Sequence, residues 1–497
     1  MEFVQNFPFF CIILSMFSAI ISFVMNGRIA KYIHVAMVTA VLILSLATLS
    51  FVAGTGESYT FMMGHFPAPW GNEIRIGELE ALMAVFFSLI MMLSVFGGMA
   101  HIDREVQDSK KNLFYILLDL LMASLLALIY TNDLFTAYVF IEINTIAACG
   151  LIMIKKQGRT YVSALRYMIM SLVGSGLFLI GLTLLYSITG HLLMSPAKVV
   201  LEQIIAEHSY QVPLMVIIIL VTVGLGIKSG LYPFHTWIPD AYGYTTPSAS
   251  AILSSLVSKG YIFLLIKIFY RVLGFDSIIS SHMVNILFAF GVIGMIMGSV
   301  AAIKERNIRR MTAYSSVAQI GYIYMGLGLG TTAGVVAAVF HIISHGVMKS
   351  LLFLSISGLT EVSDGRSDYL SLRGAGLRNK IAGVAFTVGS LSMIGMPLLT
   401  GFISKYLFAS AATTAGNKMI TAWVVLAVST VLNTMYFMRT VLTLYRPVSA
   451  EVHKEYTVEK SKIEKAAIVG LILLNIGLGV ASQPVIKAIE AGLAMFG

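Results

Sequence analysis

The chain has 497 residues, of which 58% are hydrophobic and only 11% are charged, and its mean hydropathy is +0.87. Repeated apolar runs of about 20 residues are long enough to cross a bilayer, so the composition excludes a soluble protein and predicts a polytopic membrane protein. The net charge of +9 would suggest a nucleic-acid partner in a soluble domain, which makes the position of the cations important.

The hydropathy pattern predicts about fourteen transmembrane helices and therefore an all-α polytopic fold. The loops are mostly short and none resembles a linker, so we expect a single membrane domain, 1–497, without a soluble module. Glu2 rather than a basic stretch precedes the first run, which predicts a retained span and not a signal peptide. The predicted spans are Phe9–Met25, Val35–Ala53, Leu79–Ala100, Leu113–Tyr130, Leu134–Ile154, Ala164–Ile188, Pro213–Ser229, Ser248–Val272, Val284–Ile303, Met311–Leu329, Ala333–Ser357, Ile381–Tyr406, Ile420–Leu444 and Ala466–Val480.

Lysines and arginines are distributed unequally between the two sides of this arrangement. Of the 33, 22 lie in or beside the loops that follow spans 1, 3, 5, 9, 11 and 13. The positive-inside rule makes these loops cytoplasmic and both termini external, and we expect a prokaryotic-type cytoplasmic (inner) membrane. Topology thus explains the net charge, and nucleic acid is not an expected partner. The cations on the external side are Arg75, Lys198, Arg271, Lys418 and Lys487.

The stretch Gly224–Gly260 carries two lysines inside apolar runs. Lys228 lies near the end of one run and Lys259 inside the next, with a proline-broken, aromatic-rich segment between them. A charged side chain at the centre of the bilayer costs about 2.5 to 3.5 kcal/mol or more, so it normally faces protein or water and has a function. A helix break is tolerated only where it is buried in protein or lines a wet cavity. Together these features predict an ion path.

Other ionisable residues lie at similar depth. Glu142 is in the middle of its span, and Lys405 follows the helix break MPLLTGFIS. His341, His345 and Lys349 follow one another at intervals of four residues and should share one helix face. For each of these residues the alternative is a structural role, as a buried ion pair or an interhelical hydrogen bond.

Further polar residues have weaker claims to function. Lys267, close to the end of its span, is expected to snorkel towards the membrane surface, and Asp119 and Arg439 could be functional or structural. His341 and His345 lack a third ligand nearby, so no metal site is expected. We also expect no cofactor, because no haem, flavin, quinone or iron–sulfur signature is evident. Both cysteines lie in apolar runs, which excludes a disulfide framework.

Two parts of the chain share landmarks at a constant separation. Lys405 lies 177 residues after Lys228, and Gln319 lies 177 residues after Glu142. Each pair is five spans apart, and an odd number of spans inverts the topology, as in many transporters. The predicted organisation is an N-terminal group (1–112, spans 1–3), a first five-helix repeat (113–272, spans 4–8), a second, inverted repeat (282–445, spans 9–13) and a C-terminal span (446–497), with a broken helix in each repeat.

The segment PFHTWIPDAYGYTTPSASAILSSLVSK, Pro233–Lys259, resembles a known signature. It is that of the antiporter-like subunits shared by respiratory complex I, the multisubunit Mrp cation/proton antiporters and the membrane-bound hydrogenases. The matching positions are Pro233, His235, Trp237–Ala241 and Pro247. HGVMKSLLFL and GFISK resemble two further motifs of this family, and the similarity covers nearly the whole chain. The combination of lysine at position 259 with lysine at position 405 is most similar to the pattern of the D subunit of the Mrp antiporters or of its hydrogenase counterpart.

The resemblance implies a role for each buried ionisable residue. Glu142 would pair with Lys228, Lys259 would be the connecting lysine of the eighth span, and Lys405 would be the exit-side residue of the twelfth span. The implied site residues are Glu142, Lys228, Lys259, His341, His345, Lys349 and Lys405, along one hydrated charge axis.

The expected function is ion translocation, of H⁺ or by Na⁺/H⁺ antiport, as one subunit of a multisubunit complex related to complex I. Moving one charge against 100 mV costs about 2.3 kcal/mol, so redox chemistry or a cation gradient on partner subunits must drive it. No redox chemistry is expected within this chain. Two alternatives are a non-pumping scaffold subunit of the same complex and a stand-alone secondary transporter. The sequence leaves open the choice between H⁺ and Na⁺ and the parent complex.

Overall fold

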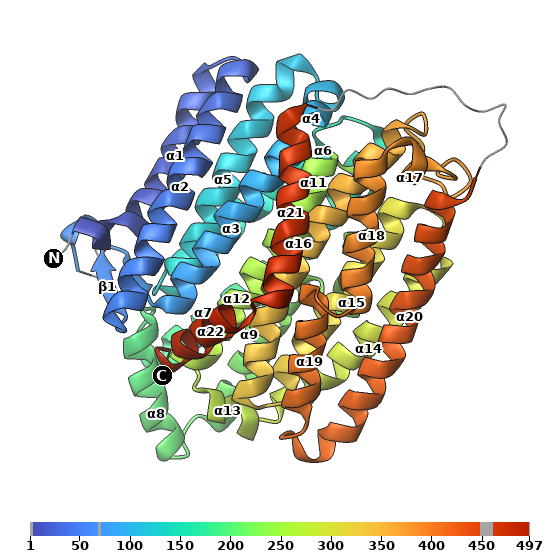
Figure 1. Ribbon diagram of the computed structural model, residues 1–497. Coiled ribbons are helices and arrows are strands. Elements are labelled where there is room, and N and C mark those ends of the chain that lie inside the picture. The colour runs from blue at the N-terminus through green and yellow to red at the C-terminus, as the bar shows by residue number, and fades with distance from the viewer. Residues whose placement is uncertain (1–2, 68–70, 448–460, 497) are drawn as a thin grey trace.

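The computed structural model describes residues 3–67, 71–447 and 461–496. Long helices run side by side through the molecule, and short helices lie at their ends (Figure 1). In the described ranges, twelve helical segments are long and apolar enough to cross a membrane, which confirms the predicted all-α polytopic membrane fold. One large apolar core contains buried residues from Cys11 to Phe496, and a smaller one lies among residues 302–444.

The expected count of fourteen spans is not established. The predicted span Met311–Leu329 is the continuous helix α15 (Ile308–Gly328), but its run of buried polar residues makes it too polar to count among the twelve. The predicted span Ile381–Tyr406 is divided into the shorter helices α18 (Lys380–Ile394) and α19 (Thr400–Ala412). Helix α15 is buried along nearly its whole length by other helices, which relieves the need for a long apolar surface.

The N-terminal part packs α1, α2 and α3 beside α5 at one edge of the molecule, shown in blue in Figure 1. A two-stranded antiparallel hairpin closes one end of this group, with Tyr59 opposite Ile76. The elements are η1 (Phe3–Asn6), α1 (Phe7–Val24), α2 (Gly27–Thr55), β1 (Tyr59–Met62), η2 (Met63–His65), β2 (Glu73–Ile76), α3 (Glu78–Gly97), α4 (Met99–Glu105) and η3 (Asp108–Lys110).

The next group contains the first predicted helix break. Helix α9 ends at Ser229, and Gly230 adopts a φ of +81°, which favours glycine. A Cβ on Gly230 would also lie only 2.2 Å from Cδ1 of Ile238. The chain continues through short helices, so the predicted break is confirmed. The elements are α5 (Lys111–Tyr130), α6 (Leu134–Met153), α7 (Gly158–Thr189), α8 (Met194–Ala206), α9 (Gln211–Ser229), η4 (Phe234–Trp237), α10 (Ile238–Tyr244), α11 (Pro247–Ile252), the π-helix η5 (Leu253–Val257), α12 (Ser258–Arg271) and α13 (Phe275–Ser280).

The second group contains the other predicted break and the central helix. Gly395 follows α18 with a φ of +96° and ends that helix, which confirms the break before Lys405. Helix α16 is buried along its transmembrane length and packs against α15, α18, α19 and α21. Because other helices surround α16, its side chains pack against protein on every face. The elements are α14 (Met283–Lys304), α15, α16 (Thr332–Glu361), α17 (Ala375–Arg378), α18, α19, η6 (Gly416–Lys418) and α20 (Met419–Tyr445).

Two helices complete the chain. Helix α21 (Lys462–Val480) crosses the molecule in contact with α3 and α16, and α22 (Gln483–Ala494) lies obliquely across one end of the bundle (Figure 1). Gly492 of α22 packs directly on Leu79, because a Cβ at position 492 would lie 2.4 Å from the Leu79 backbone nitrogen. The C-terminal helix is therefore docked on the start of α3.

Two basic residues of α12 lie deeper than the sequence predicts. The expected topology places Arg271 on the external side, yet its side chain is buried and its Nη2 lies 2.6 Å from Oε1 of Glu80, with its guanidinium 4.2 Å from the ring centre of Phe496. The prediction that Lys267 snorkels is wrong. Its buried Nζ donates hydrogen bonds to the carbonyl oxygens of Ile129 (2.7 Å) and Thr131 (2.6 Å). The last carbonyls of a helix lack partners within the helix, and Lys267 satisfies them at the end of α5.

Candidate functional site

Lys228 lies at the end of α9, beside the first helix break, and is almost completely buried. Its Nζ donates a 2.5 Å hydrogen bond to Oγ1 of Thr145 on α6 and lies 5.5 Å from the ring centre of Tyr261. The implied direct ion pair with Glu142 is not seen in the described structure: the ammonium bonds to Thr145, and Oε1 of Glu142 is buried without a hydrogen-bond partner. Thr145 lies one helix turn from Glu142, so Lys228 reaches the same part of α6 through a hydroxyl.

Hydrogen bonds hold the surroundings of Lys228 in place. Tyr261 of α12 donates from its hydroxyl to Oδ1 of Asn144 (2.9 Å), and Nδ2 of Asn144 donates to Oγ of Ser124 on α5 (2.8 Å). All three side chains are buried. This network ties α5, α6 and α12 together and fixes the aromatic ring beside the Lys228 ammonium.

Lys259 lies where the helix between α11 and α12 widens. Its fully buried Nζ donates a 2.5 Å hydrogen bond to the carbonyl oxygen of Ser254, five residues earlier and within the π-helix η5. Such widened turns free backbone groups and are frequent at functional sites. The Ser254 hydroxyl in turn lies 3.4 Å from that of Ser316 on α15. Lys259 is thus placed at the contact between the two helix groups.

The two histidines of α16 are stacked on each other. The ring centres of His341 and His345 are 5.6 Å apart and their planes are nearly parallel, at 4°. Nδ1 of His341 lies 2.6 Å from the hydroxyl of Ser404 on α19. Both ring nitrogens of His345 are buried without a hydrogen-bond partner in the described structure. A buried polar group without a partner costs free energy, so these nitrogens are suited to bind a water molecule.

Lys349 continues the same face of α16 two turns from His341, as predicted. Its Nζ donates to the carbonyl oxygen of Thr312 (2.6 Å) and to the hydroxyl of Ser315 (2.5 Å), both on α15. Ser315 is adjacent to Ser316, whose hydroxyl faces Ser254 and therefore the Lys259 position. Serines of α15 link the surroundings of the two lysines.

Lys405 fills the second helix break. It lies in α19, but its Nζ donates to the carbonyl oxygen of Ile394, the last residue of α18 (2.6 Å), and to Oγ1 of Thr430 on α20 (2.9 Å). The ammonium also lies 5.8 Å from the ring centre of Tyr322, which stacks on His341 at 5.5 Å. Lys405 and the histidines therefore form one cluster, and both helix breaks carry a lysine ammonium.

Comparison with known proteins identifies the family. Residues 131–433 match the family described as NADH:quinone oxidoreductase/Mrp antiporter, transmembrane. NADH-quinone oxidoreductase subunit N of Desulforudis audaxviator is 33% identical over 416 residues, which cover 82% of this chain and 80% of that protein. The chain belongs to this family.

The chain is also similar to subunits of Mrp-type antiporters, which confirms this part of the resemblance. The D subunit of the Na⁺/H⁺ antiporter of Alkalihalophilus pseudofirmus is 27% identical over 434 residues, 86% of this chain and 83% of that protein. A chain in the structure of the Mrp complex from Dietzia has the same fold, with a TM-score of 0.87 and 22% identity over 99% of this chain and 97% of that one. The relatives thus include subunits of both kinds of complex.

Several residues around the site of this family member were not identified from the sequence. Thr145, Ser404, Tyr322 and Thr430 contact the charged groups, but hydroxyl and aromatic residues are common in membrane spans, so no signal distinguishes them. Ser404 is next to Lys405 in the sequence, which is the one signal that could have pointed to any of the four.

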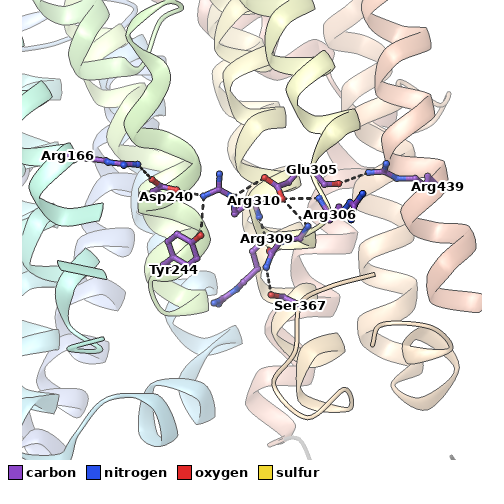
Figure 2. Close-up of polar contacts among 10 residues, drawn as sticks. Arg166, Asp240, Tyr244, Glu305, Arg306, Arg309, Arg310, Ser367 and Arg439 are labelled. Atoms are coloured by element: carbon purple, nitrogen blue, oxygen red, sulfur yellow. Dashed lines mark hydrogen bonds and ion pairs between the residues drawn. The ribbon is translucent and has the colours of Figure 1, made fainter. Parts of the chain in front are cut away.

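Asp119 and Arg439 have partners away from this site. Asp119 accepts a hydrogen bond from Ser18 (2.7 Å) and lies 2.5 Å from Nδ1 of His34, within the N-terminal helices. Arg439 donates to the carbonyl oxygen of Ile303 (2.7 Å) and to that of Glu305 (3.1 Å), and Figure 2 shows it beside Glu305 near the basic ends of the helices. These contacts favour the structural interpretation of both. In the described part of the chain, no three His, Cys, Asp or Glu side chains gather as metal ligands would.

Proposed function

We propose that this chain is an ion-translocating subunit of a multisubunit membrane complex related to complex I and the Mrp antiporters. The observation that supports it most strongly is the series of buried lysines and histidines that extends from one helix break to the other. Buried ionisable residues in a membrane domain are expensive and are kept for function. Ammonium and imidazole groups exchange protons, whereas Na⁺ prefers oxygen ligands, so protons move along this series. The proposed site residues are Glu142, Lys228, Lys259, His341, His345, Lys349 and Lys405.

The first step is a change in the contacts of Lys228. In the structure its ammonium bonds to Thr145, one helix turn from Glu142. An opposite charge nearby favours the charged form of a group. Movement of Lys228 towards Glu142 therefore holds its proton, and movement away releases the proton towards Lys259. A push on α6 or α9 from a partner subunit is sufficient to produce this change.

The later steps follow the centre of the molecule. The ring nitrogens of His345 have no protein partner in the described structure, and water at such a place can bridge polar groups. From Lys259 the proton passes by water to His345, then to the stacked His341, and through Ser404 to Lys405. Lys349 lies on a side branch towards the basic helix ends.

The proposal includes the orientation of the chain in the membrane and its division into two repeats. The basic loops are placed in the cytoplasm and both termini outside, in a prokaryotic-type cytoplasmic membrane. Residues 113–272 and 282–445 are proposed to be inverted repeats within a single membrane domain, because each contains one interrupted helix with a lysine ammonium at the interruption. Other membrane subunits supply the driving force, by redox chemistry or a cation gradient.

Lys405 gives a direct test of this function. In vesicles containing the assembled complex and a pH-sensitive dye, Lys405→Ala is expected to slow proton movement at least tenfold, because it removes an ammonium that contributes more than about 1.4 kcal/mol to carrying the charge. Lys418→Ala is the matched control, since Lys418 contacts the carbonyl oxygen of Gly328 and the ring of Phe288 at the end of the bundle, away from the proposed site residues. Unchanged transport by Lys405→Ala would favour a scaffold, and full transport by the isolated chain would favour a stand-alone transporter.

A further inference from the structure

A pocket of about 470 Å³ opens between the ends of α7, α10 and α15, on the side that carries most of the basic residues. Figure 2 shows part of its lining, with Arg166 and Arg310 on either side of Asp240 and the hydroxyl of Tyr244 beside them. The lining residues are Gly158, Arg159, Val162, Ser163, Arg166, Asp240, Tyr244 and Arg310.

The lining carries three guanidinium groups and one carboxylate. Asp240 accepts hydrogen bonds from Arg166 (Nη1 to Oδ2, 2.5 Å) and from Arg310. Arg310 is bound a second time, because its Nε donates to Glu305 at 2.9 Å. Burial opposes ionisation of Glu305, but hydrogen bonds from Arg310 and from two backbone N–H groups lower the pKa of its carboxyl, so it stays charged. Arg310 is therefore neutralised by two carboxylates.

Arg159 and Arg166 still have N–H groups available to bind an anion. The guanidinium of Arg159 lies 5.5 Å from the ring centre of Tyr244 and forms no ion pair within the described structure. The side chain of Arg166 is 60% exposed although one of its nitrogens binds Asp240. Guanidinium groups bind phosphate through pairs of N–H donors, and Tyr244 adds a hydroxyl at the same place.

An apolar track leads away from the pocket along α7. Val162, Leu165, Ile169 and Leu172 are each between 51% and 60% exposed, at the three- and four-residue spacing of one helix face. This face begins at the pocket, of which Val162 is part. A ligand with an anionic head and apolar chains would match both features at once.

We propose that this pocket binds the phosphodiester headgroup of an anionic phospholipid, with the acyl chains along α7. Basic pockets between transmembrane helices on the cytoplasmic side have the charge that such headgroups require. Arg159 and the outer part of Arg166 bind the phosphate, and Asp240 fixes the orientation of Arg166. This site is separate from the proposed ion path and does not depend on it.

Native mass spectrometry of the delipidated complex with added phosphatidylglycerol tests the proposal. Arg159→Ala with Arg166→Ala is expected to weaken binding of one phosphatidylglycerol roughly tenfold, because two charge-assisted contacts are lost. Arg28→Ala with Arg373→Ala removes the same charge from exposed positions and should change nothing. Arg159→Gln breaks no ion pair and so should fold normally, yet it should weaken binding severalfold. Lys228→Ala should bind the lipid normally even if transport is lost.

Three results would overturn the proposal. One is equal retention of phosphatidylglycerol by the wild type and both arginine variants. Another is equal retention of phosphatidylcholine, which lacks net charge. The third is binding of inorganic phosphate that depends on Arg159 with no lipid bound, which would identify a soluble phosphate site instead.

Discussion

Lys228→Ala is expected to lower ion transport by the assembled complex by roughly 60- to 300-fold while leaving assembly intact. The ammonium is buried beside the first helix break, and its one hydrogen bond among the described residues is to the Thr145 hydroxyl. Without the Lys228 ammonium, no side chain carries the proton at this position. A charge there then costs about 2.5 to 3.5 kcal/mol, on the most lenient scale for an ion in the membrane. Each 1.4 kcal/mol is about tenfold in rate, which gives the expected factor. The measurement is the initial rate of proton uptake into vesicles.

Two companion variants separate charge from geometry. Lys228→Arg keeps the cation but not the compact ammonium, and it should retain part of the rate. Thr145→Val removes the hydrogen-bond acceptor of Lys228 while leaving Glu142 in place, and it should slow transport severalfold. Normal transport by Lys228→Ala, in complexes assembled to the wild-type level, would contradict the proposed role of this lysine.

Glu80→Ala is expected to destabilise the fold by about 3 to 5 kcal/mol, because it leaves the buried Arg271 without its counter-charge. Both partners are almost completely buried, at 0% and 1% exposure, so water cannot replace the lost carboxylate. The expected observation is a large fall in the temperature at which the purified complex loses this subunit. Glu78→Ala, two residues earlier and partly exposed, is the matched control and should shift that temperature little.

A double variant gives the complementary result. Glu80→Leu with Arg271→Met replaces the ion pair by apolar side chains, and such exchanges are often neutral in stability. We therefore expect it to be far more stable than Glu80→Ala alone. A Glu80→Ala protein as stable as Glu78→Ala would show that this ion pair does not hold α3 and α12 together.

Apolar run length predicted the helices well because a membrane span must satisfy its backbone within itself. The predicted span Ala333–Ser357 corresponds to α16, which continues to Glu361 because a helix need not end where its apolar run ends. The face shared by His341, His345 and Lys349 was predicted correctly, since helical spacing alone determines it.

Partners from distant parts of the chain could not be predicted in the same way. Lys267 was expected at the surface, but the end of α5, more than 130 residues earlier, offers it carbonyl oxygens. The resemblance implied contact between Lys228 and Glu142, whereas Thr145 takes the hydrogen bond. In both cases the sequence shows that a charge is buried, but only the packing of helices determines which polar atom satisfies it.

The most direct measurement is an experimental density map of the assembled complex at a resolution that shows ordered water. We expect water within hydrogen-bonding distance of the His345 ring nitrogens, and a continuous line of water and polar side chains from Lys259 through the histidines to Lys405. Apolar side chains filling the space between Lys259 and His345, with no water there, would contradict the proposed path for protons.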